Sequence, residues 1–165
     1  MSMFRTYRGL GRFAAGGAAA LVVAAFSATA FAGSCPADKV VASGQGQKPG
    51  ATMPKGVTDT VLSSINLAGE PVKLDDHLMR LRRLVIQPGG IVPWHSHGDR
   101  PAIIYVVQGQ VTEYASSCAV PILHKAGEAT AETHLTAHWW KNTGKTTAVL
   151  LSADILHDPM DANSM

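Results

Sequence analysis

The sequence lacks the short motifs that mark three common chemistries. It has no glycine-rich phosphate loop, no Gly-x-Ser-x-Gly turn and no zinc-finger spacing of cysteines. These absences argue against a P-loop nucleotide site, an α/β-hydrolase nucleophile and a cysteine zinc module. No internal repeat is visible either.

An excess of charge of one sign is also missing. The chain has 14 Lys+Arg against 12 Asp+Glu, and residues 1–32 hold three of the arginines and no acid. The rest of the chain therefore has 11 basic and 12 acidic residues, a net charge of −1. We expect no general attraction to nucleic acid or to an anionic membrane.

Residues 1–32 have the layout of a secretory signal peptide. Three arginines precede an uncharged apolar run over residues 14–30, and Ala30-Phe31-Ala32 forms a small-x-small cleavage site. The alternative is an uncleaved membrane anchor, because the run is nearly long enough to span a bilayer. The Gly16-Gly17 pair and the cleavage site favour removal. We therefore expect an exported protein, periplasmic or secreted, that begins at Gly33 and has no stable membrane association.

Cysteine is scarce, with Cys35 and Cys118 only. In the oxidising compartment of an exported protein, such a pair is expected to form a disulfide. The alternative is two unpaired thiols. In the chain-entropy model a closed loop of about 80 residues stabilises the fold by roughly 4–5 kcal/mol.

Long helical periodicity is absent after the leader. Residues 33–56, rich in Gly, Pro, Gln and Ser, are expected to form an extended or flexible N-terminal arm. Short apolar or alternating segments then follow between Gly/Pro turns, including a turn at Pro88-Gly89-Gly90, which predicts an all-β sandwich or barrel. Two segments are apolar on both faces and should be buried on both sides, 102–108 and 146–155. The expected strands are 58–67, 78–87, 91–97, 102–108, 111–115, 130–140 and 146–155.

His95 and His97 are separated by one residue. Side chains two apart in a strand point to the same face, so both imidazoles can reach one metal ion. A third ligand must come from another strand, and His138 is our candidate. In the alternative interpretation the histidines are ordinary polar residues that line a barrel or face solvent.

The spacing around this pair resembles the first motif of the cupin superfamily. Gly89 is followed after five residues by His95, then by His97, after four residues by Ala102 and after six by Gly109. One residue departs from the pattern, because Ala102 replaces the usual glutamate. That position is expected to be taken by water, substrate or nothing.

A second, weaker match lies downstream. His138, three residues and Asn142 resemble the end of the second cupin motif, although Gly127 of the expected preceding turn stands ten residues before His138. The resemblance implies a cupin-type antiparallel β-barrel, jelly-roll-like, over residues 57–158, with a metal at its mouth. It implies that His95, His97 and His138 bind the metal, and Asn142 is expected to be structural.

Several residues are weaker candidates around this centre. His134 and Glu132 should lie too far from the metal if residues 130–140 form one extended strand. Glu113, Glu128 or Glu132 could replace the missing acid. The remaining histidines are expected to be solvated: His77, His124 and His157.

Trp94, Arg100, Ala102 and Trp140 form the expected substrate pocket. The tryptophans are otherwise packing residues of the core and the barrel rim. Arg100 could hold a substrate carboxylate, or else pair with Asp99 or another surface acid.

These observations predict an exported metalloprotein that acts on a small molecule. The metal would be iron, manganese, nickel, copper or zinc, because imidazole does not select one metal. Dioxygenase-like chemistry is favoured over isomerisation, although catalysis itself stays open. The alternative is a non-catalytic binding or sensing protein with weak or no metal. A small molecule is the expected partner, and a second copy of the chain is a further candidate.

Overall fold

The computed structural model describes residues 33–157. The expected signal peptide with its cleavage site lies outside the described residues, as does residue 158 at the expected end of the barrel. Within 33–157, no helix is long and apolar enough to cross a membrane. The elements are η1 (Ala37–Lys39), β1 (Lys55–Asn66), β2 (His77–Ser96), β3 (Ala102–Gln108), β4 (Gln110–Ala115), β5 (Ile122–Lys125), β6 (Ala129–Glu132), β7 (Ala137–Lys141) and β8 (Ala148–His157).

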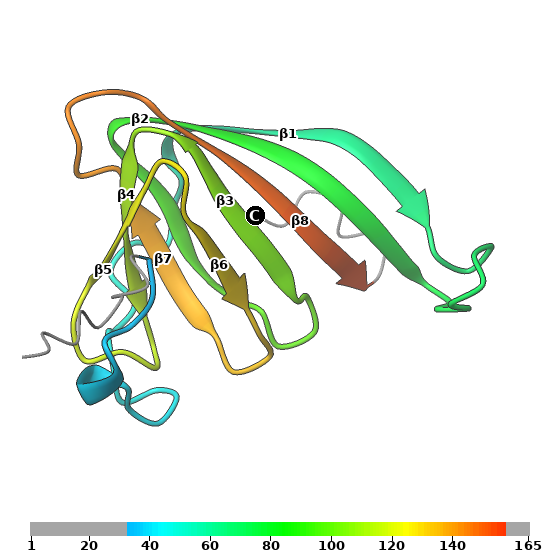
Figure 1. The fold of residues 1–165 in the computed structure, drawn as a ribbon, viewed down its shortest axis with the longest axis horizontal. Helices are drawn as coiled ribbons and strands as arrows, with labels where there is room; N and C mark the ends of the chain where they lie inside the picture. Colours follow the sequence, from blue (N-terminus) through cyan, green and yellow to red (C-terminus); the bar gives the residue numbers. More distant parts are fainter. Residues whose placement is uncertain (1–32, 158–165) are drawn as a thin grey trace, which may run out of the picture.

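The strands form one antiparallel, nearly closed barrel, as predicted (Figure 1). The strand order is β5-β4-β7-β2-β8-β3-β6, and β1 pairs with β2. The turn between β5 and β6 approaches β3 through two backbone hydrogen bonds, Val106 N to Glu128 O at 3.0 Å and Gly127 N to Val106 O at 2.9 Å. The end of β1 and the beginning of β2 extend past the other strands and are joined by the loop over residues 67–76 (Figure 1).

β2 serves both halves of the barrel. Residues 77–86 pair with β8, whereas residues 91–96 pair with β7. The expected turn at Pro88-Gly89-Gly90 is wrong, because the chain bends there within one strand. A Cβ on Gly90 would lie 2.7 Å from Gln87 O and 2.8 Å from Gly56 O, so the bend requires glycine at this position.

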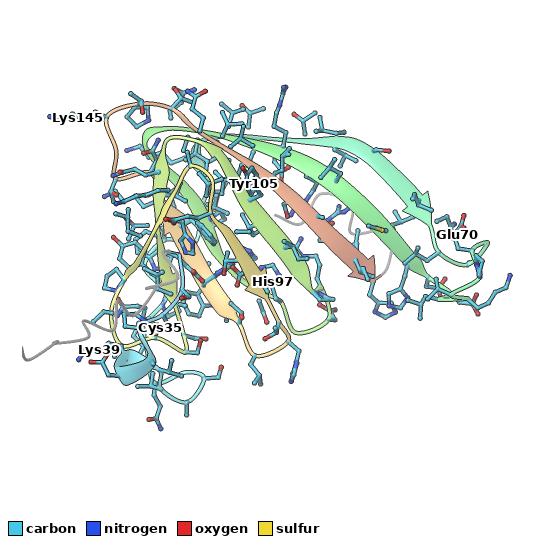
Figure 2. The ribbon with its side chains drawn as sticks, viewed as in Figure 1. Cys35, Lys39, Glu70, His97, Tyr105 and Lys145 are labelled. Atoms are coloured by element: carbon cyan, nitrogen blue, oxygen red, sulfur yellow. A yellow bond between two sulfur atoms is a disulfide. The ribbon has the colours of Figure 1, made fainter. Side chains whose placement is uncertain are left out.

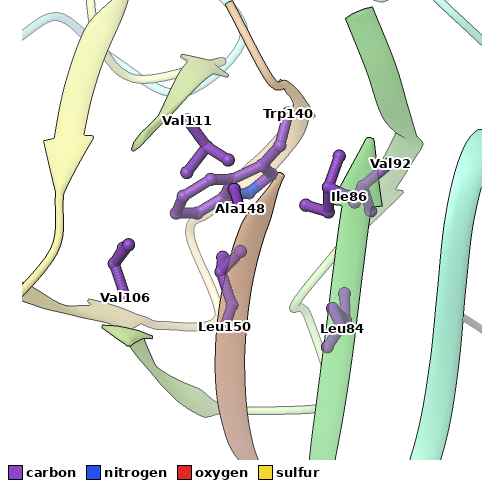
Figure 3. Close-up of a cluster of buried hydrophobic side chains, with 8 residues drawn as sticks. All are labelled: Leu84, Ile86, Val92, Val106, Val111, Trp140, Ala148 and Leu150. Carbon is purple, nitrogen blue, oxygen red and sulfur yellow. The ribbon is translucent and has the colours of Figure 1, made fainter. Parts of the chain in front are cut away.

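The apolar core fills the closed part of the barrel. Inward residues alternate along β2 and β8, as the period of two requires. Asn142 is buried beneath this core and donates from Nδ2 to Ile86 O and Thr146 O, both at 2.8 Å, which is the structural role expected of it. Figure 3 shows the core side chains Leu84, Ile86, Val92, Val106, Val111, Trp140, Ala148 and Leu150.

The outer face of β3 is exposed, contrary to the expectation of burial on both sides. Ile103, Tyr105 and Val107 are 59, 43 and 47 % exposed. Apolar residues on both faces predicted a second covering layer, and no residue within 33–157 supplies one over these side chains. In β8 the same alternation is milder, with buried and half-buried residues in turn.

The arm before β1 is held against the barrel and is not a flexible leader. Cys35 and Cys118 form a disulfide with a Cα–Cα distance of 5.8 Å. Backbone hydrogen bonds continue the attachment, including Gly46 N to Ser116 O at 2.7 Å and Ala119 N to Lys39 O at 2.9 Å. The composition of residues 33–56 indicated flexibility, but pairing with the segment after β4 satisfies its backbone groups.

Candidate metal centre

Three histidines meet inside the barrel. His95 stands on β2, His97 follows directly after its end, and His138 lies on β7, where it is the register partner of His95. Their Nε2 atoms are 3.1 Å (95–97), 3.1 Å (97–138) and 3.2 Å (95–138) apart. His97 and His138 are buried, and Figure 2 shows His97 in the barrel interior.

Each imidazole has an acceptor at its other ring nitrogen. His95 Nδ1 lies 2.9 Å from Pro93 O, His97 Nδ1 lies 2.7 Å from Arg100 O, and His138 Nδ1 lies 2.7 Å from Glu113 Oε1. These bonds favour the proton on Nδ1, and a ring that carries its proton there presents the Nε2 lone pair when it is neutral. Three lone pairs therefore face one point.

The electrostatics keep the first two rings neutral. Burial, followed by the charge of His138, lowers the pKa of His95 to about 2. The same two causes lower the pKa of His97 to about 4. At neutral pH neither ring carries the proton that would keep a cation away.

This donor set fits a divalent metal. Three nitrogens 3.1–3.2 Å apart can all lie about 2.0–2.1 Å from one ion, the usual zinc–nitrogen distance. Nδ1 hydrogen bonds to carbonyl and carboxylate oxygens are the usual supports of metal-binding histidines. The three histidines named from the sequence are thus brought together.

A buried carboxylate stands behind His138. Glu113 Oε1 accepts from His138 at 2.7 Å, and Glu113 Oε2 lies 2.8 Å from Nε2 of His124. Burial would raise the pKa of Glu113, but hydrogen bonds from His124 and His138 outweigh it and lower the pKa to about 2. The expectation that His124 is solvated is wrong, because this ring is buried beside Glu113.

Glu132 also lies close to His138, which corrects a second expectation. Residues 130–140 do not form one strand, since residues 133–136 turn between β6 and β7. The turn brings Glu132 Oε2 within 3.6 Å of His138 Nδ1. Burial and the charge of Glu113 raise the pKa of Glu132 well above its ordinary value. Both acids lie on the Nδ1 side of His138, away from the three Nε2 atoms.

The other acid and histidines named from the sequence stand apart. Glu128 belongs to the turn before β6, where its Oε2 accepts from Lys125 N at 2.7 Å. His134 is exposed in the loop between β6 and β7. His77 and His157 stack with ring centroids 4.7 Å apart at the far end of β2 and β8.

A small cavity adjoins the three histidines. Its volume is about 30 Å³, which is room for about two water molecules. Of the four residues expected in a substrate pocket, Trp140 lines this cavity. The complete lining is Arg82, Leu84, Val92, His95, His97, Ile104, His138, Trp140, Leu150 and Ser152.

The other three expected pocket residues are elsewhere. Trp94 is half-buried, and its backbone N donates to Ala51 O of the arm at 2.8 Å. Ala102 is buried between its register partners Glu132 and Asp154 and lines a separate apolar groove of about 340 Å³. Arg100 is buried, with Nε 4.0 Å from Asp154 Oδ2, and therefore does not belong to the surface as expected.

Arg100 belongs to an arginine cluster, which we define as Arg80, Arg82, Arg100, Asp59 and Asp154. Arg80 donates twice to Asp154, from Nε at 3.0 Å and from Nη2 at 2.8 Å. Arg82 donates from Nη1 to Asp59, and its Nη2 lies 3.3 Å from Asp154 Oδ2. Sequence reasoning missed Arg82 as a cavity residue. The available signal was its alternation, because Arg80 and Arg82 share a face with Leu84.

The cupin domain family model matches residues 82–154. This range holds all three histidines of the centre. No curated protein matches the chain significantly.

Solved structures are similar in fold. A predicted oxalate decarboxylase from Thermotoga maritima is 21% identical, with 74% of this chain and 98% of that chain covered and a TM-score of 0.50. An oxalate oxidase in complex with the substrate analogue glycolate is 22% identical over 68% of this chain, with a TM-score of 0.47. This chain spans 61% of the length of that oxidase. KdgF from Halomonas sp. is 18% identical, with 64% of this chain and 84% of that chain covered and a TM-score of 0.48.

Proposed function

Since residues 82–154 form a cupin domain, we propose that this chain is an exported metalloprotein that binds one divalent transition metal and acts on a small molecule. His95, His97 and His138 would hold the metal. The observation that carries the proposal is the convergence of their three Nε2 lone pairs, each set by a hydrogen bond at Nδ1. Export is supported by the signal peptide predicted from the sequence of residues 1–32 and by the disulfide.

Imidazole ligands favour iron, nickel, copper or zinc over manganese, which prefers oxygen ligands. A bound metal would supply Lewis acidity or activation of oxygen. The chain itself orients the three rings, and Leu84, Val92 and Leu150 give the cavity apolar walls. We favour dioxygenase-like chemistry over isomerisation, because no carboxylate within residues 33–157 lines the cavity to carry a proton between two carbons.

The second candidate is a binding or sensing protein with weak or no metal. Ala102 favours it, because the position where the cupin motif usually has glutamate provides no ligand. Three neutral imidazoles hold a cation without compensating its charge, and binding is weaker than with a carboxylate in the set.

Metal content separates the two candidates. Protein purified after export is stripped and then loaded separately with iron, manganese, nickel, copper and zinc, and bound metal is measured by mass spectrometry. We expect one ion per chain for at least one metal, loss of that ion in His97→Ala, and retention in His134→Ala, a matched change at an exposed histidine. Substoichiometric metal in every case would support the second candidate.

A further inference from the structure

The first residue expected after removal of the signal peptide, Gly33, lies beside a histidine and an acid of the barrel. Hydrolysis of the peptide bond between Ala32 and Gly33 consumes one water, leaves a carboxylate on Ala32 and turns the amide nitrogen of Gly33 into a protonated amine. We propose that this α-ammonium group donates hydrogen bonds to Glu128 and to Nδ1 of His124, and that it thereby supports the metal centre. The inference rests on the export that the proposed function includes.

The first argument is the shape of the space at Gly33. A Cβ built on this residue would lie 3.0 Å from His124 Nδ1 and 3.1 Å from Glu128 Oε2. These distances are crowded for a methyl carbon but ordinary for a nitrogen that donates hydrogen bonds. Rotation about the Cα–C bond of a terminal glycine moves the nitrogen into the place of a Cβ. The free ammonium group can therefore occupy this position, between the two acceptor atoms.

The second argument is charge. An α-amino group is mostly protonated at neutral pH, and Glu128 is a half-buried acid that is ionised there. Glu128 Oε2 accepts a hydrogen bond from the neutral backbone N of Lys125 at 2.7 Å. A hydrogen bond from a cation is stronger than one from a neutral donor and also compensates the carboxylate charge. The α-ammonium group supplies such a donor.

The third argument is that the surrounding structure already fixes both partners. The disulfide between Cys35 and Cys118 attaches the chain to the barrel two residues after Gly33. Glu128 is held through its backbone, because its carbonyl oxygen accepts from Val106 N at 3.0 Å. Little conformational freedom is then left to lose when the ammonium group binds, so the hydrogen bonds are favoured.

The fourth argument connects the N-terminus with the metal centre. His124 Nε2 lies 2.8 Å from Glu113 Oε2, and Glu113 Oε1 lies 2.7 Å from His138 Nδ1. A neutral ring that accepts at Nδ1 carries its proton on Nε2, where His124 donates it to Glu113. The ammonium group therefore selects the tautomer of His124 that holds Glu113 in place behind His138. Such outer supports orient the ligands of a metal.

N-terminal sequencing of the exported protein tests the premise. We expect the protein to begin at Gly33. An uncleaved chain would overturn export and this inference together. A cleaved chain that begins at another residue would overturn the inference and leave export intact.

The reactivity of the amine tests the ion pair. Two metal-free forms are released from a fusion partner in an oxidising compartment, one beginning at Gly33 and one at Ala32, so that no residue of the barrel changes. Both are acylated at pH 7.5, and the N-terminal peptide is quantified by mass spectrometry. Because a carboxylate partner keeps the amine protonated and unreactive, labelling should be roughly fivefold slower or more in the form that begins at Gly33.

Variants assign this protection to the acid. Glu128→Gln should remove the difference between the two forms, whereas Glu70→Gln, a matched change on the exposed outer loop, should preserve it. Equal labelling of the two unmodified forms would overturn the proposal, and so would protection that persists in Glu128→Gln.

Zinc affinity of the same two forms tests the link to the metal centre. The form that begins at Gly33 should bind zinc roughly threefold more tightly or better, since outer supports tune a metal site. His124→Gln should make the two forms equal. A protected amine with equal zinc affinity would overturn the link and leave the ion pair. A protected amine in protein that binds no metal would support the ion pair and overturn the metal site of the proposed function.

Discussion

Two groups of buried polar side chains lie inside this barrel, and they differ in what they leave unpaired. The histidine cluster, which we define as His95, His97, His138, Glu113 and His124, turns three lone pairs toward one point. The arginine cluster directs its charges mainly at one another, with Arg80 on Asp154 and Arg82 on Asp59. Closed ion pairs stabilise the fold, whereas converging acceptor atoms are suited to bind a cation. Arg82 belongs to the second group but also lines the cavity of the first.

The largest effect that we expect comes from breaking the arginine cluster. Asp154→Ala removes an acceptor that three buried guanidinium groups share, those of Arg80, Arg82 and Arg100, which should lower the free energy of unfolding by about 3–5 kcal/mol. Denaturant unfolding of the metal-free protein measures it, with Asp99→Ala at an exposed site as the control. A loss below 1 kcal/mol would contradict the structural role of this cluster.

A smaller effect is expected from the carboxylate behind the histidines. Glu113→Gln replaces an anion that accepts from two imidazoles with a neutral amide that has one acceptor oxygen. Metal affinity should fall about 10–100-fold, the usual effect of losing such a support. Competition with a chromophoric chelator measures the affinity, and Glu70→Gln on the exposed outer loop is the control. Unchanged affinity would mean that Glu113 does not support the metal site.

The third effect is a pH dependence of stability, to which the histidine cluster and Glu132 both contribute. The pKa values of His95 and His97 fall from 6.5 to about 2 and about 4 on folding, so the unfolded chain binds more protons than the folded one below pH 6.5. Stability of the metal-free protein should therefore be highest above pH 6.5 and fall as the pH drops toward 4. Glu132, whose pKa is raised, acts in the opposite direction above pH 4.5. The slope should therefore be smaller than the two protons, or roughly 2.7 kcal/mol per pH unit, that His95 and His97 alone would give.

Unfolding midpoints in urea between pH 7 and 4 measure this slope. Glu132→Gln should steepen it, because the opposing carboxyl is removed, while His97→Ala should flatten it. A flat profile for the wild type would indicate that the two rings titrate normally in the folded protein.

The sequence predicted what depends on local spacing. Residues two apart in a strand share a face, and this rule alone placed His95 beside His97. The resemblance supported His138, which was already the candidate third ligand, and it narrowed the expected all-β sandwich or barrel to a cupin-type barrel. The bend at Pro88-Gly89-Gly90 was missed, since a turn and a bend within one strand use the same residue types.

The other site residues are positioned by strand pairing between segments that are far apart in the sequence. Glu132 reaches His138 only because residues 133–136 turn, and His124 is buried because β5 lies beside β4. Neither arrangement can be predicted from residues that are neighbours in the sequence. The position of Arg80 and Arg82 on the same strand face as Leu84 was nevertheless informative, because charged side chains on the core face of a strand indicate buried ion pairs.

The disulfide that attaches residues 33–54 to the barrel should affect what a protease can remove from the protein. Lys39 and Lys48 are exposed on this arm, between Cys35 and the first strand. A tryptic nick after Lys39 leaves the Cys35 peptide attached to Cys118, so a non-reducing gel would still show one band. Protein produced in a reducing host has no such bond, and the same nick would release the peptide. Trimming of the N-terminus should therefore report the oxidation state of a preparation before any loss of the barrel is detected.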